Sequence, residues 1–127
     1  MPSSDKPASG TSSGRSRGRH FERLAAEFYE AKGFSILARN YQVGRRELDL
    51  IVHKPGLLVF VEVKAAADQS FGHPAQKVDR RKIEHLTAAA RQFLADHAID
   101  DSDLRFDVVA FVGGRLEHFP NAFEAAP

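Results

Sequence analysis

Apolar side chains recur along this chain at two spacings, one typical of helices and the other typical of buried strands. From Gly18, apolar residues follow one another at intervals of three and four, which predicts an amphipathic helix that ends before Gly33. The same spacing returns between Val78 and His97 and predicts a second, longer helix.

Short apolar stretches bounded by turn residues predict five strands. The predicted strands are Phe34–Arg39, Arg45–His53, Leu57–Ala65, Leu104–Val112 and a short one around Leu116–Phe119. Residues 40–44 are expected to turn the chain. Lys54-Pro55-Gly56 predicts an antiparallel hairpin between the second and third strands, and Gly113-Gly114 is a typical two-residue hairpin turn.

The order helix, three strands, helix, two strands predicts an α/β fold in which the second helix connects two parallel strands. We expect a three-layer α/β/α sandwich with a central mixed five-stranded sheet and the carboxylate-bearing hairpin at its centre. Residues 1–14 are rich in Ser, Gly and Pro and lack an apolar period, which predicts a disordered tail. Residues 15–125 are expected to form a single domain.

Composition narrows the protein class. The chain contains no cysteine, which excludes disulfides and thiolate zinc sites. The sequence shows no apolar stretch near the roughly 20 residues that span a bilayer, and its N-terminus lacks an apolar signal core. We therefore expect a cytoplasmic protein without a membrane partner.

Four ionisable side chains interrupt the central hairpin, where covered strands would carry Val or Ile. Because side chains alternate along a strand, Glu47 and Asp49 share one face, as do Glu62 and Lys64. A turn with an even number of residues places Asp49 opposite Glu62, with Cβ atoms about 4.5–5.5 Å apart. The same register places Glu47 opposite Lys64. Two carboxylates that close repel each other unless one is protonated or a cation lies between them.

A divalent cation with oxygen ligands resolves this repulsion, and carboxylates without Cys or paired His favour Mg²⁺ or Mn²⁺ over Zn²⁺. Asp49 and Glu62 are the predicted ligands, and the main-chain carbonyl of Val63 could add a third. Lys64 would then orient the attacking water or stabilise negative charge on a phosphate. The alternative is that these groups form solvent-facing ion pairs that contribute little to stability.

Positive charge gathers in segments on either side of the hairpin, although the formal net charge is only +1. The gathered residues are Arg15, Arg17, Arg19, Arg23, Arg39, Arg45, Arg46, Lys77, Arg80, Arg81 and Lys82. Clustered Lys and Arg are the usual electrostatic footprint of a nucleic-acid partner, and they are equally typical of a solvated surface.

Several motifs together resemble the YraN family of small bacterial proteins. The motifs are Gly18-Arg19-x-x-Glu22, Arg46-Glu-Leu-Asp-Leu-Ile51, Val61-Glu-Val-Lys64, Phe71-Gly72 and Arg105-Phe106-Asp107. They extend over nearly all of the chain from Gly18 to Phe123. That family in turn is similar to the PD-(D/E)xK nuclease superfamily, which has the fold of type II restriction enzymes and archaeal Holliday junction resolvases.

The resemblance implies a restriction-endonuclease-like fold and Mg²⁺-dependent chemistry on DNA phosphodiesters, branched DNA included. Asp49 is the implied acidic residue, and Glu62-Val63-Lys64 is the implied Glu-x-Lys triplet. Glu22 resembles a helix-borne glutamate that approaches the metal through water, although it could instead pair with Arg19. A homodimer is expected if the substrate is a two-fold symmetric junction.

The resemblance also indicates nucleic-acid contacts, with two departures. Gln76 and Lys82 either touch the substrate backbone or are simply solvated. Arg46 stands where the family commonly has Gly, and Ala65 and Ala66 stand where it commonly has Thr and Arg. These departures spare the predicted metal ligands and weaken the expected phosphate contacts.

The leading hypothesis is thus a metal-dependent, endonuclease-like protein acting on DNA, with Asp49, Glu62 and Lys64 at its centre. Glu47 and Glu22 are further candidates for the site. The alternative is a non-catalytic nucleic-acid-binding module that keeps the nuclease fold. Its binding would depend on Arg45, Arg46, Arg80 and Arg81. A separate carboxylate, Asp107, is expected either to approach the same pocket or to pair with Arg105.

Overall fold

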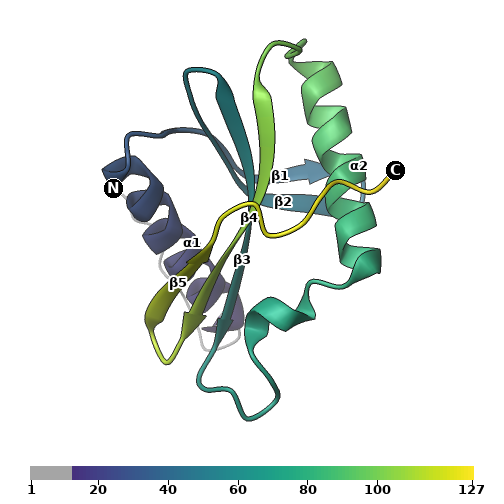
Figure 1. The fold of residues 1–127 in the computed structure, drawn as a ribbon. Coiled ribbons are helices and arrows are strands. Elements are labelled where there is room, and N and C mark those ends of the chain that lie inside the picture. Colours follow the sequence, from purple (N-terminus) through teal and green to yellow (C-terminus); the bar gives the residue numbers. More distant parts are fainter. Residues whose placement is uncertain (1–12) are drawn as a thin grey trace.

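The computed structural model describes residues 13–127, with side chains from residue 18 onward, and contains two α-helices and a five-stranded sheet (Figure 1). In chain order the elements are α1 (Ser13–Ala31), β1 (Ser35–Val43), β2 (Arg46–Lys54), β3 (Leu57–Ala66), the 3-10 helix η2 (Pro74–Lys77), α2 (Arg80–Asp96), β4 (Asp103–Val112) and β5 (Arg115–Phe119). Each α-helix and strand expected from the sequence is present, and the α/β class is confirmed.

The sheet is mixed, and its strands follow the order β1-β2-β3-β4-β5. Neighbouring strands are antiparallel except β3 and β4, which are parallel and are connected through η2 and α2. Pro55 and Gly56 form a two-residue turn between β2 and β3, so the predicted hairpin exists and β3 is the central strand.

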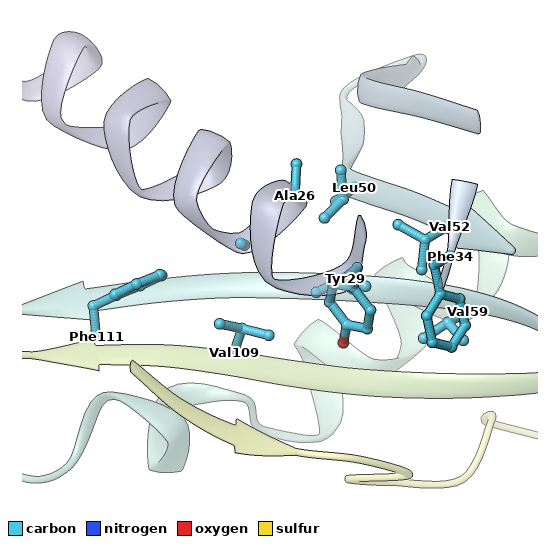
Figure 2. Close-up of a cluster of buried hydrophobic side chains, with 10 residues drawn as sticks. Ala26, Tyr29, Phe34, Leu50, Val52, Val59, Val109 and Phe111 are labelled. Atoms are coloured by element: carbon cyan, nitrogen blue, oxygen red, sulfur yellow. The ribbon is translucent and has the colours of Figure 1, made fainter. Parts of the chain in front are cut away.

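Alternating side chains on β3 divide the core into two clusters. Val59 and Val61 pack with α1, whereas Leu58 and Phe60 pack with α2, so the two helices cover opposite faces of the sheet. Figure 2 shows the cluster beneath α1, where the ring of Tyr29 lies among aliphatic side chains of the sheet. Burial of each such Val or Leu side chain contributes about 1.5–3 kcal/mol to stability.

Local signals in the sequence fix the helix ends. Gly33 ends α1 with a φ of 93°, and the Phe34 N–H donates back to the Tyr29 carbonyl at 3.1 Å, which closes the last turn. At the start of α2, the Asp79 carboxylate accepts a hydrogen bond from the Lys82 N–H at 3.0 Å. Because Lys82 is the third residue of α2, this N-cap also fixes the position of Lys82 relative to the sheet.

Two sequence predictions need correction or restriction. The turn expected over residues 40–44 is wrong, because β1 continues through Asn40 and pairs with β2 as far as Val43. Asn40 adopts a φ of 51°, a left-handed conformation that asparagine tolerates better than most residues, so the strand bends without ending. The disordered tail expected over residues 1–14 lies outside the described residues except for its last two positions, which begin α1. Within the described range, no helix is long and apolar enough to cross a membrane.

Candidate functional site

The two central strands separate where the sequence places its carboxylates. The ladder between β2 and β3 ends at the pair Leu50–Val61, one residue before Asp49 and Glu62. Beyond this point β2 pairs only with β1, and β3 pairs only with β4. Figure 1 shows the result, with β1 and the adjoining half of β2 running across the direction of β3 and β4. A split therefore opens in the sheet at the candidate site.

Asp49 lies on the β2 side of this split. Its Oδ2 accepts a hydrogen bond from the Val63 N–H at 2.9 Å, a donor that a continuing β-ladder would have used. Burial raises the pKa of Asp49 to about 8, and the neighbouring charge of Glu62 adds to the rise. Although the ladder stops one pair short of Asp49 and Glu62, the two carboxyl groups are close enough for the charge of Glu62 to raise the pKa of Asp49, so the sequence prediction that they lie together agrees with the structure.

Glu62 lies on the β3 side and is only 4 % exposed. Its Oε2 contacts two ammonium groups, Lys64 Nζ at 3.4 Å and Lys82 Nζ at 3.2 Å. Its Oε1 is buried without a hydrogen-bond partner, and no other buried side-chain nitrogen or oxygen in the described part of the chain is left in that state. A buried carboxylate oxygen without a donor is costly, because the water that it has lost is not replaced.

Lys82 was expected either to contact the substrate backbone or to be solvated, and its ion pair with Glu62 was missed. The signal that locates it is the N-cap at Asp79, which starts α2 beside the sheet and directs the first turn toward β3. Lys64 and Lys82 are 27 % and 36 % exposed, so both ammonium groups remain accessible from solvent.

Glu22 and Glu47 lie on the α1 side of the split. Both line an open cleft of about 400 Å³ together with Arg19 and Asn40. Burial raises the pKa of Glu22, and the charge of Glu47 raises it further, while the Asn40 amide partly opposes the rise. The ion pairs among the described side chains do not include Arg19 with Glu22. The acidic group is thus larger than the Asp49–Glu62 pair, because Glu22 also raises the pKa of Asp49.

One predicted pairing is wrong. Glu47 does not lie opposite Lys64, because β2 pairs with β3 only from Leu50 onward and the register needed for that pair is not formed. Lys64 contacts Glu62 instead, while Glu47 faces the α1 cleft.

A larger cleft of about 670 Å³ adjoins the first and shares Gly18 and Glu22 with it. Val63 lines this cleft together with Ala65 and Ala66. The alanine side chains add no polar group to the cleft wall.

The remaining residues predicted to contact nucleic acid are exposed and spread around the site. They are Arg19 on α1, Arg45 and Arg46 at the turn into β2, Gln76 on η2, and Arg80 and Arg81 in the first turn of α2. None of the five arginines forms an ion pair within the described part of the chain. Arg80 and Arg81 directly precede Lys82, so their charges are nearest in sequence to the Glu62 pair.

Asp107 does not approach this site, and the expected pairing with Arg105 is the one observed. The Arg105 guanidinium donates to both oxygens of Asp107, at 2.8 and 2.9 Å. Tyr29 Oη donates at 2.6 Å, and His118 Nε2 and the Asn121 N–H each lie at 2.9 Å. Burial alone would raise the pKa of Asp107, but these hydrogen bonds more than offset it and lower the pKa.

The donor set at the split fits a hard divalent cation. Asp49 and Glu62 offer carboxylate oxygens, and Glu62 Oε1 has no competing donor. Among residues 13–127 no group of three or more His, Asp or Glu side chains forms a ready-made cage. Mg²⁺ characteristically takes one or two carboxylates and completes its shell with water and substrate phosphate, so two carboxylates suit it.

Comparison with known proteins places the chain among bacterial relatives of similar length. A family model described as "Uncharacterised protein family UPF0102" matches residues 21–111, which include every carboxylate of the site. A UPF0102 protein of Aeromonas hydrophila is 40 % identical over 110 residues, covering 85 % of this chain and 85 % of the relative. One from Burkholderia ambifaria is 42 % identical over 118 residues, covering 92 % and 82 %. One from Sulfurihydrogenibium sp. is 35 % identical over 107 residues, covering 84 % and 93 %.

Proposed function

Because the chain belongs to the uncharacterised protein family UPF0102, whose description names no reaction, we propose a function from the site itself: metal-dependent hydrolysis of phosphodiesters in DNA. The observation that carries this proposal is Glu62, a buried carboxylate with one oxygen facing no donor and the other held by two lysines. That arrangement suits a cation on one oxygen and an anionic substrate beside the other.

The carboxylate pair supports the cation half of the proposal. Burial raises the pKa of Asp49 to about 8, with the charge of Glu62 adding to the rise, so near neutral pH the pair holds a proton that a divalent cation would replace. Asp49, Glu62 and the carbonyl of Val63 are the groups that would hold Mg²⁺ or Mn²⁺. Such an ion, when bound, lowers the pKa of a coordinated water and withdraws charge from the scissile phosphate.

The two lysines support the substrate half. Lys64 and Lys82 bring two positive charges to a single carboxylate oxygen, so one charge remains uncompensated. A phosphate oxygen at the mouth of the split would balance it. Lys64 lies two residues after Glu62 on the same face of β3, where its ammonium can orient the attacking water or stabilise charge that develops on the phosphate.

Two carboxylates further from the pair have supporting roles in this proposal. Glu22 and Glu47 line the adjoining cleft, where they can accept hydrogen bonds from ordered water next to the cation. Exposed arginines around the split, including Arg80 and Arg81, would then hold the flanking phosphates.

The proposed chemistry agrees with a finer assignment of the fold. We propose the three-layer α/β/α sandwich of the restriction-endonuclease-like nucleases. Support comes from α1 and α2 packing on opposite faces of the sheet, and from the central hairpin that carries Asp49 and Glu62. The resemblance to PD-(D/E)xK nucleases is the reason for naming DNA as the substrate.

Cleavage assays test the proposal. The full chain is incubated with Mg²⁺ or Mn²⁺ and with branched, flapped, single-stranded and duplex DNA. We expect cation-dependent cleavage of at least one substrate, and a loss of about a hundredfold or more in the Lys64→Ala variant. Lys54→Ala is the matched control, because it removes the same charge from the turn end of the same hairpin.

Equal activity of the wild type and Lys64→Ala would refute the catalytic assignment. If no substrate is cleaved but DNA binds with a steep dependence on salt, the non-catalytic binding module replaces the nuclease. Arg80→Ala and Arg81→Ala would then weaken binding, whereas Lys64→Ala would have no special effect.

A further inference from the structure

The connection between β3 and α2 is held at both ends by the same carboxylate. Lys64 lies near the end of β3, before the connection, and Lys82 lies in the first turn of α2, after it. Both ammonium groups contact Glu62 Oε2. Figure 1 shows this connection projecting beyond the end of the sheet. Because both ends of the connection contact Glu62, the connection begins and ends at the candidate site.

The first half of the connection is fixed by its own hydrogen bonds. The Asp68 carboxylate accepts from the Ser70 N–H at 2.9 Å and from the Ser70 hydroxyl at 2.6 Å. The Gly72 N–H donates to the Gln69 carbonyl at 2.9 Å, and Gly72 has a φ of 89°, which a residue with a side chain would adopt only under strain. Residues 68–72 thus form a tight turn of defined shape.

The second half is anchored to β5. His73 Nδ1 accepts a hydrogen bond from the Ala75 N–H at 3.0 Å, so the other ring nitrogen carries the proton. That nitrogen donates to Glu117 on β5 at 2.6 Å. Pro74 is buried beside it. The turn is therefore attached to the sheet immediately after its tip.

Phe71 stands at the tip of this fixed turn with 88 % of its surface exposed. The other exposed large apolar residues of the described chain are 37–49 % exposed. Complete burial of a phenylalanine would contribute about 1.5–3 kcal/mol, which this position forgoes. A rigid turn that holds an aromatic ring in water is pre-organised to bind something flat and apolar.

Charge identifies the partner. The residues that follow the turn along the chain include Lys77, Arg80, Arg81 and Lys82, so the exposed ring is followed, from six residues onward, by a run of cations that leads back to Glu62. An aromatic ring next to a cationic track is the usual arrangement for single-stranded nucleic acid, because bases stack on the ring while the cations follow the phosphates. A purely apolar protein partner would leave those cations without partners.

We propose that Phe71 stacks on an unpaired nucleobase of the substrate while the adjoining phosphate lies at Lys64 and Lys82. This inference rests on the proposed function and extends it, because it makes the presence of unpaired bases near the bound phosphate a condition for tight binding. Phe71 stands seven positions after Lys64, so their Cα atoms lie at most about 25 Å apart. In an intact duplex the base faces are already stacked, so Phe71 has no free face to contact there.

A tryptophan substituted for Phe71 provides a direct readout, because the chain contains no other tryptophan. The Phe71→Trp variant is titrated in EDTA, where no cleavage is expected, with single-stranded, flapped and duplex DNA of equal length. Stacking should quench its fluorescence saturably with the first two and leave it nearly unchanged with duplex. Leu104→Trp is the matched control, because Leu104 is 49 % exposed at the start of β4, at the opposite end of the sheet.

Affinity gives a second readout. Phe71→Ala should weaken binding of single-stranded and flapped DNA by about 5- to 100-fold, the range measured for loss of one base-stacking aromatic, and leave duplex affinity unchanged. Its melting temperature should match that of the wild type, because the ring makes almost no contact with the fold.

Three outcomes would overturn the inference. If the wild type binds or cleaves DNA while Phe71→Trp is not quenched and Phe71→Ala binds equally well, the stacking role fails and the proposed function stands. If no DNA binds under any condition, the proposed function fails and the inference fails with it. If the fluorescence of the Phe71→Trp variant shifts to the blue with rising protein concentration and without DNA, the ring packs against a second copy of the chain.

Discussion

Two buried carboxylates, Asp107 and Glu62, lie on neighbouring strands at adjacent positions, and they differ in how fully their oxygens are hydrogen-bonded. Asp107 on β4 pairs with Val61, and Glu62 on β3 pairs with Val108, so the two side chains point to opposite faces of the sheet. Asp107 accepts five hydrogen bonds and is fully buried. Glu62 is almost as buried, yet its Oε1 has no partner.

The difference separates a carboxylate that is satisfied within the fold from one that is not, and the proposed metal site depends on the second. At Asp107 hydrogen bonds within the fold offset the cost of burying the charge. The donors come from three elements: Tyr29 on α1, Arg105 on β4 and His118 on β5. At Glu62 the fold supplies cations to one oxygen and no donor to the other, and Asp49 is a neighbouring carboxyl group. An unsatisfied pair of this kind is tolerated where a ligand completes it.

The largest effect should follow from removing the satisfied carboxylate. Asp107→Ala leaves the Arg105 guanidinium and the Tyr29 hydroxyl without their acceptor, and we expect the free energy of unfolding to fall by about 3–5 kcal/mol. Urea denaturation followed by circular dichroism measures this. A loss below about 1 kcal/mol would mean that the network has little structural role.

The opposite sign is expected at the split. Asp49→Asn keeps an acceptor for the Val63 N–H, removes the repulsion with Glu62 and supplies an amide donor toward Glu62 Oε1. We expect the metal-free protein to gain about 1–2 kcal/mol of stability and to lose its Mg²⁺ response. Thermal denaturation with and without Mg²⁺ tests both. A destabilised Asp49→Asn variant would show that Asp49 is a structural residue like Asp107.

The two sites should also give opposite dependence of stability on pH. The folded pKa of Asp107 is lowered, so its contribution is present above the unfolded value near 3.9 and is lost as the pH falls through the folded pKa. The folded pKa of Asp49 is raised to about 8, so the metal-free protein loses stability as the pH rises from about 4 through 8. Urea denaturation at a series of pH values gives the slope of the unfolding free energy against pH, and repeating it on Asp107→Asn and Asp49→Asn assigns each slope to a residue. If a slope is unchanged in the corresponding variant, it belongs to another group.

The smallest effect is expected from the cations at Glu62. Lys82→Ala removes one of two half-exposed ammonium groups, and we expect the unfolding free energy to change by less than about 1 kcal/mol. Arg105→Ala is the matched change at the other carboxylate and should cost about 3 kcal/mol, since a bidentate partner of a buried charge is lost. Comparable losses in the two variants would remove the distinction between the sites.

Most of the fold follows from local patterns. Alternation along the strands, the Pro55-Gly56 turn and Gly33 at the end of α1 are each decided by a few neighbouring residues. The hairpin register depends on the length of that turn, which is why the place of Asp49 beside Glu62 could be predicted before the structure.

The parts that sequence patterns missed depend on contacts between distant segments. The left-handed Asn40 bends β1 together with β2, and that bend removes Glu47 from Lys64. Tyr29 and Asp107 are far apart in the sequence, and so are Lys82 and Glu62. The spacing of apolar residues does not predict these contacts, because they depend on how the helices pack across the sheet.

The short ladder between β2 and β3 has a geometric consequence. Only the five pairs from Leu50–Val61 to Lys54–Leu57 join β1 and β2 to β3, β4 and β5 within the sheet, so the two parts of the sheet diverge beyond it. Asp49 and Glu62 lie just past the end of this ladder, one on each part. A ligand bound to both carboxylates would therefore add a connection between the two parts at the place where the ladder supplies none.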